Sequence, residues 1–86
     1  MYTVYKSEIF LRRFYRLDNS EQQRIILIEN KLKDFVNGKP LAGPWFLEKK
    51  INGKRLYFIV DPKEQKRLFI DFGDKKEQQC IIDSVI

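Results

Sequence analysis

The sequence predicts a small α+β domain in which helices pack on one face of an antiparallel sheet. Two segments before Gly43 repeat apolar side chains at helical spacing, and three segments after it read as strands. Asn52 and Gly53 form the dipeptide that most strongly favours a two-residue hairpin turn. Since the chain has 86 residues, we expect residues 1–86 to form a single domain.

The first strand and helix are expected near the N-terminus. Residues 2–5 are aromatic or β-branched, which predicts a short strand. Ser7 is a side chain of the type that caps a helix N-terminus. Phe10, Phe14 and Leu17 follow at i, i+4, i+7 spacing, so they share one helix face. The opposite, solvated face of this helix carries Arg12, Arg13 and Arg16.

A second helix is expected to start at Ser20 and to end before Gly38. Ser20 and Gln23 fit a capping box, in which each side chain accepts a hydrogen bond from the other residue's backbone N–H. Gly38 is the residue type that follows a helix end, and Pro40 does not continue a helix. The apolar stripe of this helix contains Ile25, Ile28, Leu32 and Phe35.

Three strands and a last helix complete the expected order of strand, helix, helix, strand, strand, strand, helix. Residues 62–65 form the turn between the last two strands. Asp74 and Glu77 fit a second capping box at the start of the final helix. Lys75 and Lys76 lie in its first turn, where free backbone N–H groups favour an anion. The expected strands span residues 45–51, 54–61 and 67–72.

The two-residue turn determines which hairpin residues lie opposite each other. Lys50 pairs with Arg55, and Glu48 pairs with Tyr57, so all four side chains share one face of the sheet. The like charges of Lys50 and Arg55 require compensation, either from Glu48 or from an external anion. The other face is expected to belong to the core and carries Trp45, Leu47, Leu56, Phe58 and Val60.

Composition narrows the classes of partner. The net charge of +5 favours an anionic partner such as nucleic acid, an acidic protein or a membrane surface. Histidine is absent, so the usual base near neutral pH and the usual metal ligand are missing, and we expect no metal and no cofactor. The single cysteine fits a reducing, cytoplasmic location. No apolar run is long enough to span a membrane, so we expect no membrane partner.

Three short segments also resemble those of a known family. Residues 52–57 contain a Gly-x-Arg-apolar-aromatic pattern, and residues 72–79 contain a Gly followed by a basic pair. Residues 39–43 look like a Lys-x-Leu-x-Gly segment between the second helix and the sheet. With the element order, they resemble the RelE/ParE superfamily of toxins from type II toxin–antitoxin pairs over nearly the whole chain.

The RelE-like branch implies a metal-independent endoribonuclease that cleaves messenger RNA on the ribosome through attack by the RNA's own 2′-OH. In this resemblance Arg55 matches the strand arginine that contacts the scissile phosphate, and Lys75 matches a basic residue after the last strand. A strict register puts Glu48 and Phe46 at the positions of the family's strand lysines. The implied catalytic residues are Arg55, Lys75 and Tyr57, and the implied RNA-binding residues are Lys49, Lys50, Lys54 and Lys76.

The C-terminal tyrosine of RelE enzymes has no counterpart in residues 78–82. Tyr57 is its expected substitute, as a stacking group or a base, because it shares a face with Arg55. Two alternatives stay open. One is a ParE-like toxin that inhibits DNA gyrase by binding it, and the other is a RelE-like protein without activity. The resemblance implies an antitoxin as the protein partner of a toxin of either branch.

Overall fold

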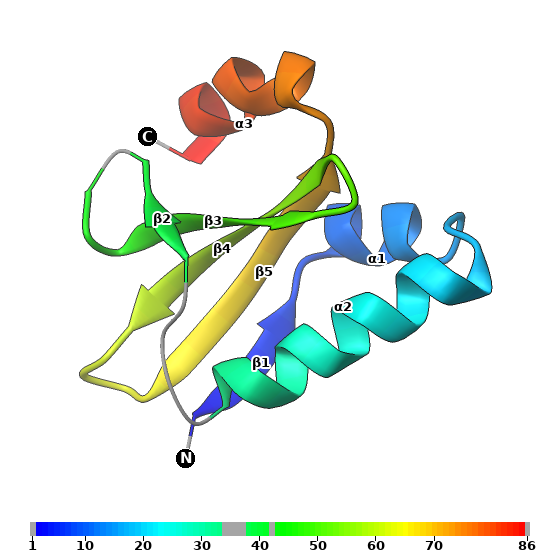
Figure 1. Cartoon of the computed structure of the whole chain (residues 1–86). Coiled ribbons are helices and arrows are strands. Elements are labelled where there is room, and N and C mark those ends of the chain that lie inside the picture. The colour runs from blue at the N-terminus through cyan, green and yellow to red at the C-terminus, as the bar shows by residue number, and fades with distance from the viewer. Residues whose placement is uncertain (1, 34–37, 42, 86) are drawn as a thin grey trace.

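The α+β class and the predicted order of elements are confirmed by the computed structural model, which describes residues 2–33, 38–41 and 43–85 except for the side chain of Lys75 (Figure 1). One further short strand, β2, precedes the predicted hairpin. The elements are β1 (Thr3–Lys6), α1 (Glu8–Phe14), α2 (Asn19–Leu32), β2 (Lys39–Pro40), β3 (Phe46–Ile51), β4 (Lys54–Asp61), β5 (Lys66–Gly73), the 3-10 helix η1 (Lys75–Glu77) and α3 (Gln78–Val85).

The strands of the described residues form one sheet in the order β1-β5-β4-β3-β2. The hairpin register is the predicted one, with Lys50 opposite Arg55. Asn52 and Gly53 have φ angles of 51° and 78°, and a type I′ turn requires positive φ at both positions. The turn dipeptide therefore set the pairing of β3 and β4.

The sheet is mixed, so the expectation of a wholly antiparallel sheet was wrong at one edge. β1 pairs in parallel with β5, and Tyr5 lies opposite Leu68. The remaining strand pairs are antiparallel. Local sequence identifies β1 as a strand, but its direction depends on the helical connection that separates it from the rest of the sheet.

The first predicted cap is confirmed and the second is wrong. Ser7 accepts a hydrogen bond from the backbone N–H of Phe10 at 3.0 Å, as a helix cap does. At α2 the cap is Asp18, which accepts a hydrogen bond from the N–H of Glu21 at 2.8 Å, and not Ser20. Both residue types cap well, so the choice depended on where the chain turns after α1.

The predicted end of α2 at Gly38 is wrong, because the helix ends at Leu32. Phe35 lies outside the described residues, within the gap at 34–37. Gly38 has a φ outside the left-handed region. A Cβ at Gly38 would lie 2.9 Å from the carbonyl oxygen of Glu48 and 3.0 Å from the ring of Phe58. The glycine therefore allows β2 to approach β3 closely.

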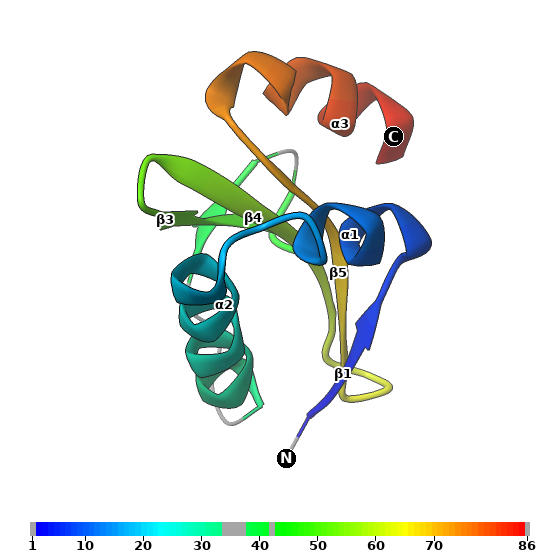
Figure 2. The same ribbon diagram turned by 90° about the vertical axis from the view of Figure 1, so that its right-hand side faces the viewer.

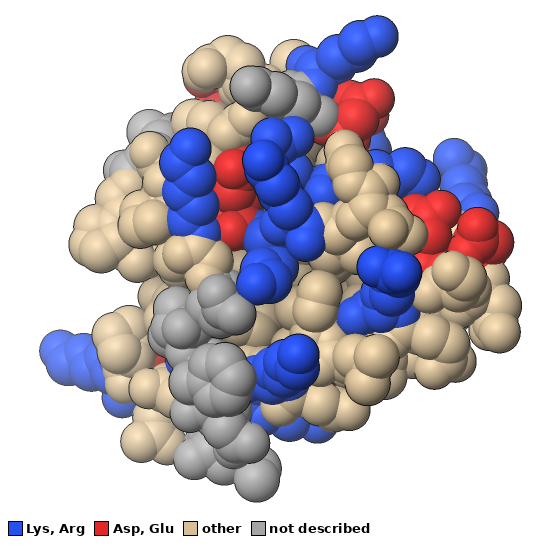
Figure 3. Space-filling view, in the orientation of Figure 1, with Lys and Arg blue, Asp and Glu red and all other residues tan. Residues whose placement is uncertain are grey.

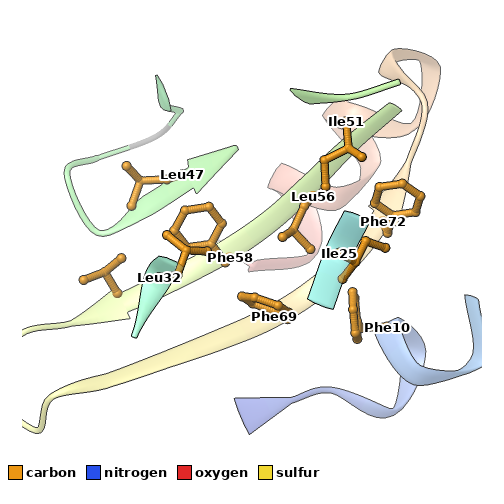
Figure 4. Close-up of a cluster of buried hydrophobic side chains, with 10 residues drawn as sticks. Phe10, Ile25, Leu32, Leu47, Ile51, Leu56, Phe58, Phe69 and Phe72 are labelled. Carbon is orange, nitrogen blue, oxygen red and sulfur yellow. The ribbon is translucent and has the colours of Figure 1, made fainter. Parts of the chain in front are cut away.

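The main core lies between the sheet and helices α1 and α2 (Figure 4). Phe10 from α1 packs edge to face on Phe69 of β5, with ring centroids 5.4 Å apart. Trp45 is an exception among the predicted core residues. It is 40% exposed and stacks on Phe46 at the end of β3. The predicted inward positions that are buried in this core are Leu47, Leu56, Phe58 and Val60.

The last helix packs on the opposite face of the sheet, which corrects the expectation that all helices share one face. Ile81 of α3 forms a second buried cluster with Phe46 and Tyr57. Figures 1 and 2 show β3 and β4 passing between α2 and α3. The face that carries Arg55 is therefore largely covered. Its apolar residues, Phe46 and Tyr57, explain why a helix packs there.

Candidate functional site

A row of polar residues crosses the sheet on the face that α3 covers. The strand registers place Lys39 of β2 opposite Glu48, Glu48 opposite Tyr57, and Tyr57 opposite Asp71 of β5. The neighbouring row holds Lys50, Arg55 and Gly73. Since opposite residues of adjacent strands share a face, the two rows form one polar layer near the hairpin end of the sheet.

Glu48 neutralises the pair of like charges at Lys50 and Arg55, as one of the two predicted alternatives required. Its Oε2 lies 3.2 Å from Arg55 Nε, at an angle outside that of a hydrogen bond, so the contact is an ion pair. The side chains of Glu48 and Arg55 are 6% and 12% exposed. A carboxylate and a guanidinium this close attract each other more strongly in a buried setting than in water. The Nε of Arg55 is buried in this contact, so only a small part of its side chain is open to a ligand.

Tyr57 lies at the centre of the polar row and is fully buried. Its ring therefore has no free face on which an RNA nucleobase could stack, so the expected stacking role does not fit. Burial raises the pKa of its hydroxyl, and the negative charge of Glu48 raises it further. The neutral phenol is favoured, so Tyr57 does not fit the expected role of a proton-accepting base either. Among the described residues its hydroxyl has no hydrogen-bond partner.

Asp71 ends the row and contacts a residue that the sequence placed elsewhere. Its Oδ1 lies 2.9 Å from Arg13 Nε and accepts a hydrogen bond from the backbone N–H of Phe72 at 2.7 Å. Burial nevertheless raises the pKa of this carboxyl, against the opposing effects of the Phe72 hydrogen bond and of Arg13. Arg13 was expected on the solvated face of its helix. Helical periodicity contains no signal that α1 ends beside β5.

The predicted lysines are divided between the two faces of the sheet. Lys50 is exposed on the same face as Arg55. Lys49 lies opposite Leu56 and lines a hollow beside α2. Lys54 also faces the helices, where its Nζ lies 3.1 Å from Glu21 Oε2. Only one of these three lysines therefore adjoins Arg55 on the site face.

The predicted lysines of the final helix lie in η1. The backbone N–H of Lys76 donates to Asp74 Oδ1 at 3.1 Å, and the side chain of Lys76 is exposed. The side chain of Lys75 lies outside the described part of the structure. Glu77 contacts Arg13, whereas the predicted capping box would have it reach back to Asp74. The cap is therefore formed by Asp74 alone.

An open cleft of about 220 Å³ lies between β2 and β3, and one of its lining residues is Glu48, the partner of Arg55. Gly38, Lys39, Glu48, Lys49 and Lys50 line it, so one carboxylate is surrounded by three lysines. Lys39 was not among the predicted site residues, because its position beside Glu48 depends on the short strand β2. In the space-filling view, Lys and Arg side chains predominate over acidic ones on this side of the molecule (Figure 3). The excess of lysines suits the cleft to an anionic ligand.

The described residues were also inspected for a metal site, a reactive thiol and a membrane-spanning helix. No group of three or more acidic, histidine or cysteine side chains there could hold a metal ion. Cys80 is exposed, and its thiol is free. None of the helices among these residues has the length and apolar character to cross a membrane.

Comparison with known proteins identifies the fold. No family model matches the chain, and no curated protein matches its sequence. The isolated E. coli RelE toxin matches with a TM-score of 0.74 and 14% identity, covering 100% of both chains. A chain of the intact E. coli RelBE toxin–antitoxin complex matches with a TM-score of 0.78 and 16% identity, covering 86% of this chain and 96% of that chain. A chain of the Pyrococcus horikoshii RelE–RelB complex matches with a TM-score of 0.74 and 12% identity, covering 86% and 94%.

The class defined by these matches is the RelE-like fold. The expected resemblance is confirmed at that level, since the structural neighbours include RelE toxins alone and in complexes with RelB. At 12–16% identity the likeness concerns the fold, and the function must be argued from the site.

Proposed function

We propose that this protein is the toxin of a toxin–antitoxin pair and that it cleaves messenger RNA on the ribosome. The observation that carries the proposal is the position of Arg55 in a RelE-like fold: its side chain is 12% exposed, lies opposite Lys50 and pairs with Glu48, which lines an open cleft with several lysines. Arginine binds phosphate oxygens through paired N–H groups in a fixed geometry. Arg55 would hold the scissile phosphate and stabilise the charge that develops on it.

The lysines around Arg55 would bind the RNA backbone. Lys50 is exposed on the face of Arg55, and Lys76 is exposed on η1, in the segment that leads to α3. Lys75 remains a proposed catalytic residue on the basis of the resemblance. Lys49 lines the cleft as well as a hollow beside α2, and Lys54 faces the helices, so both would contribute through their charge. Their positive field attracts an RNA strand even where they make no contact with it.

The protein partner in this proposal is an antitoxin. Two of the matching chains come from complexes with RelB, and the E. coli RelBE complex is a toxin–antitoxin complex. The net charge of +5 favours an acidic antitoxin. Co-expression with the neighbouring reading frame should yield a stable complex and relieve any growth arrest.

Induced expression in a bacterial host tests the toxin activity. Wild-type protein should arrest growth and produce cleavage sites within translated messages, which primer extension would map. Arg55→Lys is the informative variant because it keeps the charge beside buried Glu48 but loses the paired N–H groups. Arg55→Ala would leave Glu48 without its counter-ion, at a cost of about 3 kcal/mol. Arg12→Ala is the matched control, since Arg12 pairs only with exposed Glu8 in the described structure.

The result separates the candidate functions. Cleavage that is lost in Arg55→Lys and kept in Arg12→Ala supports the ribonuclease. Growth arrest without message cleavage, unchanged in Arg55→Lys, would instead support a ParE-like toxin that binds DNA gyrase. Expression without any growth effect would support an inactive RelE-like protein.

A further inference from the structure

A second open hollow, of about 220 Å³, lies between α2 and the β3–β4 hairpin, and we call it the α2–hairpin hollow. Three exposed cations line it, and no carboxylate is among the described residues that do so. The cations are Arg24 and Lys31 of α2 and Lys50 of β3. The other lining residues are Leu27, Ile28, Ile51 and Asn52.

The α2 residues of this hollow form one stripe along the helix. Arg24, Leu27, Ile28 and Lys31 follow one another at i, i+3, i+4 and i+7, the spacing of side chains that are neighbours on a helix surface. Leu27 is 61% exposed, although it lines the same hollow as Ile51, which is 3% exposed. The stripe is therefore an apolar strip with a cation at each end.

The carboxylates of α2 do not neutralise these cations. The helix contains two, Glu21 and Glu29. Glu21 pairs with Lys54 at 3.1 Å, and Glu29 pairs with Lys6 at 2.9 Å. Within the described part of the chain, none of the three cations of the hollow takes part in an ion pair. Their charge is available to a partner.

The chemistry of the hollow favours a protein partner over RNA. Proteins bind single RNA strands through aromatic rings that stack on bases and cations that hold phosphates. The described residues that line the hollow include no aromatic side chain. Leu27 and Ile28 instead match the aliphatic side chains of a helix, while Arg24 and Lys31 match carboxylates on the same helix.

We propose that the α2–hairpin hollow binds an acidic amphipathic helix of a partner protein. The identity of that partner as the antitoxin rests on the proposed function, whereas the surface and its chemistry do not. Arg24 and Lys31 are seven positions apart, which is about 10.5 Å along a helix. The partner helix therefore carries acidic residues about seven positions apart, with leucine or isoleucine between them on the same face.

Lys50 connects the hollow to the candidate site. It lines both the α2–hairpin hollow and the cleft that contains Glu48. Carboxylates of a helix bound in the hollow compete with RNA phosphates for this ammonium group. The partner thus weakens RNA binding without contacting Arg55.

Fluorescence anisotropy with a synthetic helix tests the surface. The probe is a labelled peptide with glutamates seven positions apart and leucines between them on one face. A reference peptide has the same composition in an order that spreads the leucines around the helix. Wild type should bind the probe about 10-fold more tightly, and Leu27→Ser should remove that difference. Ile26→Ser is the matched control, since Ile26 is exposed on α2 but lines the groove beside α1.

A pair of double variants tests the charges. Arg24→Ala with Lys31→Ala should weaken binding of the probe roughly 3- to 10-fold at low salt, as expected for two exposed ion pairs. The effect should shrink as added salt screens the charges. Arg16→Ala with Lys63→Ala removes two exposed cations elsewhere and should leave the affinity close to that of wild type. Circular dichroism establishes that each variant folds.

The possible failures are distinguishable. If the two peptides bind equally, or Leu27→Ser binds the probe as tightly as wild type, the surface is overturned. If a single-stranded oligonucleotide of the same charge binds more tightly than the probe, and Arg24→Ala with Lys31→Ala abolishes that binding, the ligand is RNA and the protein partner is overturned.

Peptide binding is measured without ribosomes. A protein that binds the probe but cleaves no message therefore keeps this surface and loses the proposed ribonuclease function. If wild type cleaves messages, saturating probe should inhibit its cleavage and leave that of Leu27→Ser unchanged. Uninhibited wild-type cleavage would overturn the connection through Lys50.

Discussion

Arg13 Nε lies 2.9 Å from Asp71 Oδ1, which ties the end of α1 to the end of β5. The same guanidinium also contacts the carboxylate of Glu77 in η1 and lies 3.4 Å from the carbonyl oxygen of Phe72. One side chain thus joins the helical layer, the sheet and the segment that leads into α3. Arg13 therefore ties η1, which leads into the covering helix α3, to α1 on the other face of the sheet.

We expect Arg13→Ala to lower the free energy of unfolding by about 1–3 kcal/mol, because Asp71 stays buried without its counter-ion. Amide hydrogen exchange should also become faster in residues 78–85, since the start of α3 loses its tie to α1. Arg12→Ala, which removes an exposed pair one residue away, should cost about 0.5 kcal/mol or less. Equal losses in the two variants would show that the Asp71 contact contributes nothing.

Tyr57 should make the protein sensitive to alkaline pH. Its pKa is raised above the ordinary tyrosine value of 10.0 by burial and then by the charge of Glu48, so the folded state holds the phenolic proton more tightly than the unfolded chain does. The stability from this group is complete below the unfolded pKa and is lost as the pH rises through the folded pKa. Tyr57→Phe should therefore lose less stability above pH 10 in urea unfolding series. Parallel curves for the two proteins would refute this prediction.

Glycine at position 53 should be needed for stability because of its backbone conformation and not because space is short around it. Its φ is 78°, and a Cβ there would meet nothing within 4 Å. Gly53→Ala should thus cost about 1–2 kcal/mol from the left-handed conformation, measured by urea denaturation. Asn52→Gly should stay within about 0.5 kcal/mol of wild type, because glycine accepts the φ of 51°. A stable Gly53→Ala protein would mean that the turn relaxes to another type.

Lys50 and Lys63 should differ in RNA binding if the proposed function holds. Lys50 is exposed on the site face, whereas Lys63 is exposed in the turn between β4 and β5, at the other end of β4 from the Asn52-Gly53 turn. Lys50→Ala should reduce the slope of log K against log salt by about 0.7, the value for one lost contact to a single strand. Lys63→Ala should leave the slope close to that of wild type. Salt titrations of binding to a ribosome complex with a 2′-deoxynucleotide at the cleavage site measure both.

The sequence alone predicted the features whose physical cause lies within a few neighbouring residues. Asn52 and Gly53 determine the hairpin register, and that register alone placed Glu48, Arg55 and Tyr57 on one face. Ser7 was identified as a cap for the same reason, since it contacts a backbone group three residues away. The segments that resemble RelE/ParE toxins predicted the fold class, which the structural matches confirm.

Contacts between elements that are far apart in the sequence were not predicted, because no local sequence pattern indicates them. The second layer formed by α3 depends on Phe46 and Tyr57, which the sequence placed on a polar face. The same layer buries Tyr57 and so removes its expected roles. Lys39 joins the cleft only through β2, a strand of two residues that is too short to show alternation.

The alternation of side chains and the turn chemistry thus determined which residues of β3 and β4 share a face, since each strand displays its own period of two. Tertiary structure decided whether that face is open or covered, because burial depends on which distant helix packs against it. It also brought Arg13 to Asp71, from positions 58 residues apart in the sequence. The face of Arg55 was predicted from the sequence, whereas the burial of that face under α3 and the cleft that Glu48 lines with three lysines required the folded chain.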